Sequence, residues 1–150
     1  MTTIAVTQLE QRVGQELAVG DWLEMTQDRI DQFAESTGDR QWIHVDPVRA
    51  AQSPFKTTIA HGFLTLSLVS VLLRNAITIT GVRMAINYGV NRVRFVTPVP
   101  STAKVRGRFT LAAVDQMGGG TQAVWAVTIE CEGEQKLACV AEWLVRYYPD

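Results

Sequence analysis

The sequence predicts an α+β fold in which an antiparallel sheet wraps around one long central helix. Two observations support this prediction. Residues 59–74 form the longest segment with helical character, and it is apolar on most sides, as expected when other elements surround a helix. From residue 81 onward the hydrophobic period changes to two, which is typical of antiparallel strands. A sheet with one apolar face would cover such a helix.

Composition indicates one globular domain, residues 1–150, with a neutral or small-molecule partner. A chain of 150 residues buries about two-thirds of its unfolded surface without disulfides or metal. The hydrophobic content is 47%, the charged content is 19% and the net charge is −1, so no electrostatic argument favours nucleic acid or a membrane surface. No internal repeat, linker or low-complexity segment divides the chain.

We expect a cytoplasmic protein. Residues 1–9 have neither the positive region nor the apolar region of a secretory signal. The most apolar run, residues 63–73, contains two serines and is shorter than the ~20 residues that a membrane helix requires. Cys131 and Cys139 lie in strand-like sequence without metal-ligand spacing, and we interpret both as reduced core residues.

The first half of the chain predicts mostly helices. Residues 1–18 are weakly patterned and fit an arm or a short helix, and residues 20–26 alternate enough to form a strand. Thr26 is a suitable N-cap and Gly38 a suitable helix stop, so a helix is expected between them. Four residues repeat at i, i+3, i+4 and i+7 and make this helix amphipathic: Ile30, Phe33, Ala34 and Thr37.

Two further helices follow. Pro47 suits the first position of a short helix that Asp46 would cap and that ends at residue 51, before Ser53-Pro54. The central helix is then expected over residues 59–74.

Three or four long antiparallel strands are expected in the second half. The first has Met84, Ile86, Tyr88 and Val90 on one face, with a bulge near residues 89–92, and it ends at Pro98 and Pro100. Turns at residues 117–120 and 133–134 separate the last strands. Their apolar faces are Val105, Gly107, Phe109, Leu111 and Ala113; Ala123, Trp125, Val127, Ile129 and Cys131; and Leu137, Cys139, Ala141, Trp143 and Val145.

Residues 33–47 and 55–64 contain polar side chains that follow no single period, which suggests a site. Asp39 follows the expected helix stop, and His44 comes five residues later on the same short loop. A carboxylate with a pKa of about 3.9 and an imidazole with a pKa of about 6.5 can orient a water and exchange its proton at neutral pH. The spacing alone also fits a non-catalytic interpretation, in which Asp39 accepts hydrogen bonds from backbone amides of its loop and His44 is a polar residue with its hydrogen bonds satisfied.

This stretch resembles the motif of the MaoC-like hydratases, the R-specific enoyl-CoA hydratase (hydratase 2) group. Gln41-Trp42 stands where the family has Asn-Pro, and the similarity covers roughly residues 20–100. The resemblance implies a hot-dog fold and a homodimer whose two sheets join edge to edge. The matching residues are Phe33, Ala34, Thr37, Gly38, Asp39, Ile43, His44, Asp46, Ala60, His61 and Gly62.

The resemblance also implies roles for single residues. Asp39 and His44 would hold one water, with Gln41 in place of the asparagine that assists the pair. The backbone amide of Gly62, at the start of the central helix, would polarise a thioester carbonyl, although close packing also explains a glycine there. Ser67 matches a serine near the reacting centre, or it bonds a helix carbonyl.

Other polar residues have ordinary explanations. His61 is a supporting residue or a cap with no acid or base work, and Asp46 is read as an N-cap. The basic stripe of Lys104, Arg106 and Arg108 fits the solvent face of a strand, with coenzyme A phosphates as the alternative. No metal site, phosphate loop or nucleophile elbow is visible, and no metal or redox cofactor is expected.

The implied function is reversible addition of water to a trans-2-enoyl thioester, giving the (R)-3-hydroxyacyl thioester in fatty acid metabolism. The substrate would be an acyl-CoA or an acyl-carrier thioester. One alternative is a hot-dog thioesterase, against which residues 60–73 contain no Asp or Glu. The other is a catalytically silent acyl-CoA-binding module, which the Gln41-Trp42 departure keeps open.

Overall fold

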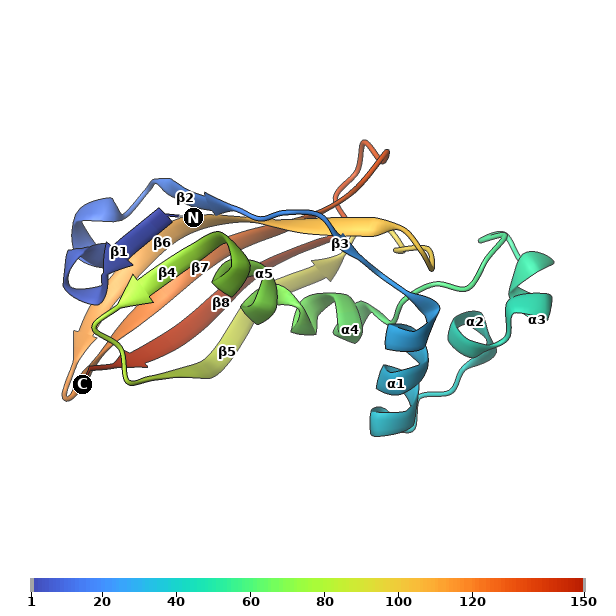
Figure 1. The fold of residues 1–150 in the computed structure, drawn as a ribbon, viewed down its shortest axis with the longest axis horizontal. Coiled ribbons are helices and arrows are strands. Elements are labelled where there is room, and N and C mark those ends of the chain that lie inside the picture. The colour runs from blue at the N-terminus through green and yellow to red at the C-terminus, as the bar shows by residue number, and fades with distance from the viewer. Residues whose placement is uncertain (1, 150) are drawn as a thin grey trace.

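An antiparallel sheet and a helix that lies across one of its faces form the body of the molecule (Figure 1). The computed structural model describes residues 2–149. The strand order is β2-β6-β7-β8-β5, and the short strand β3 also pairs with β6. The predicted α+β class, with an antiparallel sheet around a central helix, is confirmed. The strands are β2 (Glu16–Val19), β3 (Leu23–Glu24), β5 (Met84–Phe95), β6 (Lys104–Met117), β7 (Gly120–Cys131) and β8 (Cys139–Tyr148).

The long strands alternate as predicted. Every second residue of β7 and β8 is buried, because one face of the sheet packs on the helix and the other faces solvent. Trp125 and Phe109 are fully buried at the centre of this packed face. Cys131 and Cys139 are free thiols in the same core, and burial raises the pKa of Cys139 to about 11. The prediction of reduced core cysteines is therefore confirmed.

The central helix consists of two parts, α4 (Gly62–Ser67) and α5 (Val69–Ala76). They meet at Leu68, whose N–H bonds the carbonyl of Thr65 at 3.3 Å, an i to i−3 contact that tightens the turn. The predicted start at residue 59 is wrong by one turn. Ile59 instead bridges Pro100, and the Ala60 N–H donates to the Val99 carbonyl at 2.8 Å, which keeps this segment extended.

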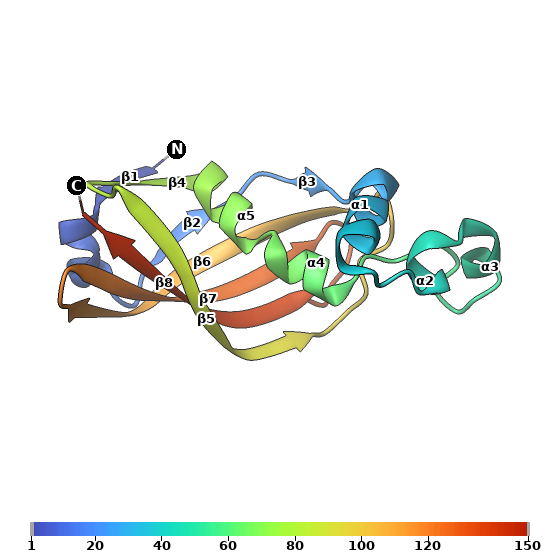
Figure 2. The same cartoon turned by 90° about the horizontal axis from the view of Figure 1, so that it is seen from below.

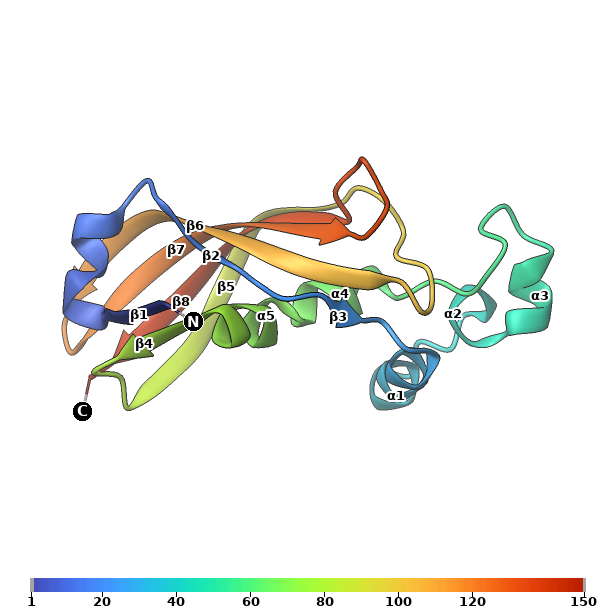
Figure 3. The same ribbon diagram turned by 45° about the horizontal axis from the view of Figure 1, so that its top comes forward.

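The N-terminal prediction was only partly right. A short 3-10 helix (Val6–Arg12) is present, but it lies between β1 (Thr2–Ala5) and β2. β1 pairs in parallel with β4 (Ile77–Thr80), so two segments far apart in sequence lie side by side (Figure 3). The strand expected over residues 20–26 is reduced to β3, which pairs with β6. Pairing with distant partners leaves no local periodic signal.

Strand β5 differs from its prediction at Val90. Met84 and Ile86 pair with Tyr148 and Arg146 on the outer face, whereas Val90 lies opposite Trp143, a buried residue of the helix side. A register shift between Asn87 and Gly89 reverses the side-chain alternation before Val90. A second shift, between Asn91 and Arg94, falls where a bulge was expected.

Three short helices extend beyond one end of the sheet: α1 (Gln27–Thr37), α2 (Trp42–Val45) and α3 (Pro47–Ala51) (Figure 2). The predicted caps are confirmed. Thr26 Oγ1 accepts the Arg29 N–H at 3.1 Å, and Gly38 ends α1 in the left-handed region with φ 80°. Asp46 Oδ1 accepts the Arg49 N–H at 3.0 Å and caps α3. Among residues 2–149, no helix is long and apolar enough to cross a membrane.

Candidate active site

His44 is buried at the junction between the short helices and the central helix. It is 6% exposed, and its Nδ1 lies 2.6 Å from the carbonyl oxygen of Ile59. A carbonyl oxygen can only accept, so Nδ1 carries the proton and Nε2 has the free lone pair. The His44 carbonyl accepts from Gln27 Nε2 at 2.8 Å, which fixes the residue at both ends. This tautomer leaves Nε2 as a proton acceptor.

His61 lies directly against His44. Their rings stack with centroids 3.8 Å apart and planes 23° apart, and the Phe33 ring lies 4.8 Å from His61. His61 is 3% exposed, and its Nε2 is 2.9 Å from the backbone carbonyl oxygen of Asp39. His61 thus connects the start of α4 to the loop that follows α1. Sequence reasoning noticed His61 beside Gly62 but gave it no partner.

Asp39 is exposed and lies beside the two imidazoles. Ligand-type side-chain atoms of Asp39, His44 and His61 lie within 4.8 Å of one another. Asp39 Oδ1 accepts the backbone N–H of Gln41 at 3.4 Å, a contact that orients the carboxylate within its loop. The fold therefore brings together the acid and the imidazole that were selected from the sequence.

The surroundings of His44 favour the neutral imidazole. Burial is the largest cause that lowers its pKa below the usual 6.5, and the hydrogen bond to Ile59 opposes it. The neighbouring His61 lowers the pKa further, and Asp39 raises it. Because a charged imidazole is poorly solvated at this position, His44 remains an acceptor at neutral pH.

A cavity of about 250 Å³ opens beside His44. Its walls are mostly apolar, with Ile43, Val99 and Phe95 among them. The polar residues in its lining include Thr65 and Thr97. Thr97 Oγ1 is buried and has no hydrogen-bond partner among the described residues. Sequence reasoning missed both threonines. Thr65 lies within α4, and Thr97 lies in the loop after β5 and reaches the site only through the fold.

Gly62 also lines this cavity. It is the first helical residue of α4, where a backbone N–H has no acceptor within its own helix. A Cβ at this position would lie 2.7 Å from Cδ2 of Phe95, so the close approach of that ring requires a glycine. Gly62 can therefore both allow the close packing of Phe95 and offer its backbone N–H as a hydrogen-bond donor.

Two expected supporting residues lie at the edge of this arrangement. Gln41 is exposed at the start of α2, and its side chain makes no capping hydrogen bond. Ser67 Oγ donates to the carbonyl of Leu64 at 2.7 Å, the helix-carbonyl bond that was the alternative for this serine. Neither residue belongs to the lining of the cavity beside His44.

The stacked arrangement of the two imidazole rings does not favour metal binding. Metal bonds lie in the plane of each imidazole ring, and two stacked rings direct their lone pairs side by side rather than to one point.

The basic stripe on β6 is engaged in ion pairs: Arg106 pairs with Glu130, and Arg108 pairs with Glu16 at 2.8 Å. These contacts fit the solvent face of a strand.

The antiparallel sheet wrapped around a central helix, with Asp39 and His44 close to His61 at the start of that helix, defines a protein of the hot-dog class. Solved structures agree on the fold. An unliganded R-hydratase from Pseudomonas aeruginosa superimposes with a TM-score of 0.73 over 92% of this chain and 83% of that chain, at 22% identity. An (R)-hydratase from A. caviae gives 0.72 over 89% and 94%, at 26% identity.

The chain belongs to the MaoC-like domain family, whose model matches residues 8–133. It is 50% identical over 144 residues to 3-hydroxyacyl-thioester dehydratase Z of Mycobacterium tuberculosis, covering 95% of each chain. It is 44% identical over 148 residues to nodulation protein N of Rhizobium leguminosarum bv. viciae, covering 96% of this chain and 91% of that protein. The resemblance inferred from the Asp39 and His44 motif is confirmed at the level of the family.

Proposed function

We propose that this protein is a hydro-lyase that interconverts a trans-2-enoyl thioester and the (R)-3-hydroxyacyl thioester. One observation carries the proposal: the side chains of Asp39, His44 and His61 lie close together beside a cavity, and Gly62 at the start of the central helix lines the same cavity. The 50% identity to a 3-hydroxyacyl-thioester dehydratase over nearly the whole chain supports the same reaction.

In the hydration direction, Asp39 and His44 hold one water against C3 of the enoyl group. The water oxygen bonds to C3 while His44 Nε2 accepts a proton, and the π electrons move towards the thioester oxygen. The Gly62 N–H donates to that oxygen as its charge develops. C2 then takes a proton back from the pair, so both parts of one water add to the same face. Dehydration follows the reverse path.

We propose a homodimer that forms through strand β5. β5 is the edge of the sheet and presents unpaired backbone groups together with apolar side chains, including Met84 at 43%, Ile86 at 43% and Tyr88 at 55% exposure. A second copy of this chain is the simplest partner for the β5 edge. If two β5 strands pair antiparallel about a two-fold axis, the apolar surface of one copy contacts the same surface of the other.

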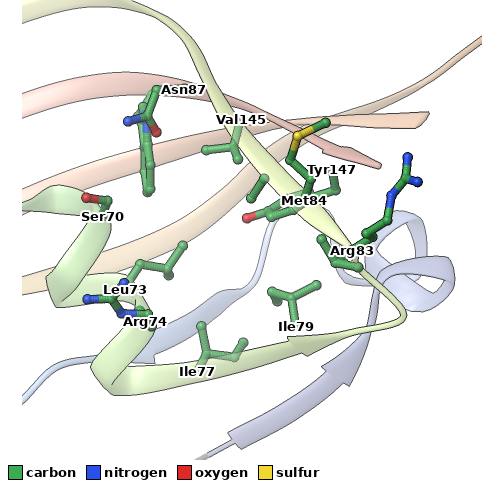
Figure 4. Close-up of a pocket in the computed structure, with 13 residues that line it drawn as sticks. Ser70, Leu73, Arg74, Ile77, Ile79, Arg83, Met84, Asn87, Val145 and Tyr147 are labelled. Atoms are coloured by element: carbon green, nitrogen blue, oxygen red, sulfur yellow. The ribbon is translucent and has the colours of Figure 1, made fainter. Parts of the chain in front are cut away.

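The acyl chain would then occupy a larger cavity. A space of about 400 Å³ lies between α5, β4 and the first half of β5, with Leu73, Ile77 and Val145 in its walls (Figure 4). In one chain it lies away from the catalytic loop. Antiparallel pairing of two β5 strands places the start of one strand beside the end of the other. The partner's cavity would thus adjoin the Gly62 end of this chain.

The free thiols of Cys131 and Cys139 suit a reducing compartment, in agreement with a cytoplasmic enzyme. The substrate class is the acyl thioester, carried on coenzyme A or on an acyl-carrier protein.

A single assay tests the reaction. Purified protein is incubated with crotonyl-CoA, the enoyl absorbance and free thiol are followed together, and the product is analysed on a chiral column. Loss of the enoyl signal without thiol release, with the R-3-hydroxyacyl product, is expected. Thiol release as the main outcome would instead identify a thioesterase. Binding of the thioester without either signal would identify a silent acyl-binding module.

A further inference from the structure

We propose that His61 is a positioning residue with two separable tasks: its Nε2–H holds the backbone of Asp39, and its ring shields His44. This inference rests on the proposed hydro-lyase function for its kinetic consequences. It rests on geometry alone for the proton positions described below.

The first task follows from one hydrogen bond. The Asp39 carbonyl oxygen accepts, so His61 Nε2, at 2.9 Å, must carry the proton. Asp39 lies in an exposed loop between α1 and α2, and its other hydrogen bonds join it to its near neighbours Thr37 and Gln41. The bond from His61 therefore connects this loop to the first turn of the central helix. Without it, the Asp39 carboxylate would lose its fixed distance to His44.

The second task follows from the stack. With a centroid distance of 3.8 Å, the His61 ring covers one face of His44 and keeps water from it. The groups whose charges act on His44 are Asp39 and His61, and both lie in this cluster. A polar side chain that is smaller than an imidazole would admit water to the His44 ring and stabilise its charged form.

The free nitrogen of His61 supports a role beyond filling space. His61 Nδ1 is buried without a hydrogen-bond partner among the described residues. Buried polar atoms are nearly always paired, so an apolar ring such as phenylalanine would be the simpler choice if only packing mattered. The donor on Nε2 is the property that phenylalanine cannot supply.

Two variants separate the tasks. His61→Gln can place an amide N–H near the position of Nε2 but has no ring, and His61→Phe keeps a stacked ring but has no donor. We expect His61→Phe to lower kcat by about tenfold to a hundredfold, with KM changed less than threefold. The acid limb of the pH profile should move less than in His61→Gln, because the phenyl ring still covers His44 and only the charge effect of His61 is lost. We expect His61→Gln to retain more of kcat but to move the acid limb to higher pH.

A purely structural role would give a different pattern. Both variants would then lower Tm while kcat per folded enzyme and the pH profile stayed at the wild-type values, and that outcome would overturn the proposal. The proposal would also be overturned if His61→Phe and His61→Gln lowered kcat equally and neither moved the pH profile.

A measurement on the wild-type protein does not depend on turnover or on the folding of a variant. Imidazole ¹⁵N NMR at pH 7 should show the proton on Nε2 of His61 and on Nδ1 of His44. The opposite tautomer of His61 would end the proposal even if the enzyme hydrates crotonyl-CoA. If the wild type does not hydrate an enoyl thioester but both tautomers are as expected, the proposed function fails and the positioning geometry stands.

Discussion

His44 and His61 lie face to face in the interior, with ring centroids 3.8 Å apart, and each is bonded to a different backbone carbonyl. The Ile59 carbonyl fixes the tautomer of His44, and the Asp39 carbonyl fixes that of His61. Two backbone oxygens thus decide where the protons of the site are located. The accessible lone pair of His44 at Nε2 follows from this arrangement.

Removal of either member of the acid and imidazole pair should abolish most activity. Asp39→Asn keeps the shape but removes the negative charge, and His44→Ala removes the imidazole. Each should lower kcat by about 10²–10⁴, the usual contribution of a general acid or base, with a much smaller effect on KM. The double variant should be little worse than the poorer single variant, because residues that act on one water are not additive.

Asp46→Asn is the control for this experiment. Asp46 caps α3 through its bond to the Arg49 N–H, and asparagine caps nearly as well as aspartate, so activity should stay within about threefold. If Asp46→Asn abolished turnover and Asp39→Asn did not, the assignment of the carboxylate would be wrong even though the family is correct.

Stability should decrease in mild acid because of His44. Its folded pKa lies below the value of about 6.5 that the unfolded chain has, mainly through burial. The unfolded state therefore binds the proton first as the pH falls. The contribution of His44 is complete above about pH 6.5 and is lost as the pH falls through the folded pKa. The difference in Tm between pH 7.5 and pH 5.5 should be smaller in His44→Gln than in the wild type.

The β5 edge should control assembly. Ile86→Lys introduces a charge at an exposed apolar position, so it should leave the fold intact and shift the 16.6 kDa chain from dimer to monomer in analytical ultracentrifugation. Activity should fall with dimer content if the partner's cavity holds the acyl chain. Val48→Lys, at a 76% exposed site on α3, is the matched control and should change neither quantity. A wild-type monomer at micromolar concentration would contradict this prediction.

Gly62 should not tolerate a side chain. Gly62→Ala places a methyl group 2.7 Å from the Phe95 ring, and the resulting shift should cost about 1–3 kcal/mol and displace the amide from the cavity. A tenfold or larger loss in kcat/KM is expected. Phe95→Ala in the same chain makes room for the methyl group, so the double variant should recover part of the loss. No recovery would mean that the methyl group acts on the substrate rather than on Phe95.

The parts of the fold that could be predicted are those with local causes. The caps at Thr26, Gly38 and Asp46 depend on neighbouring backbone groups, and the alternation of β6 to β8 reflects a single buried face. The family motif located Asp39 and His44 for the same reason, since Asp39 in the loop after α1 and His44 in α2 are close together in the sequence. These features do not depend on distant contacts.

The remaining features depend on contacts between distant residues. The stack of His44 on His61 forms only when the loop after α1 folds against the start of α4. Thr97 reaches the cavity from the loop after β5, and β4 exists because β1 pairs with it. The reversed face at Val90 follows from the register shift between Asn87 and Gly89. Single-sequence periodicity does not contain these relationships.

The pairing of β2 with β6 has a consequence for the time at which the protein becomes active. Glu16 and Arg108 form an ion pair across 92 residues, and most of the chain must be synthesised before this pair can form. Sheets built from such distant partners fold slowly, typically in milliseconds to seconds, because loop closure costs entropy before contacts compensate for it. The apolar side of the central helix therefore has no complete sheet to cover it until the last hairpin, β7–β8, has been synthesised.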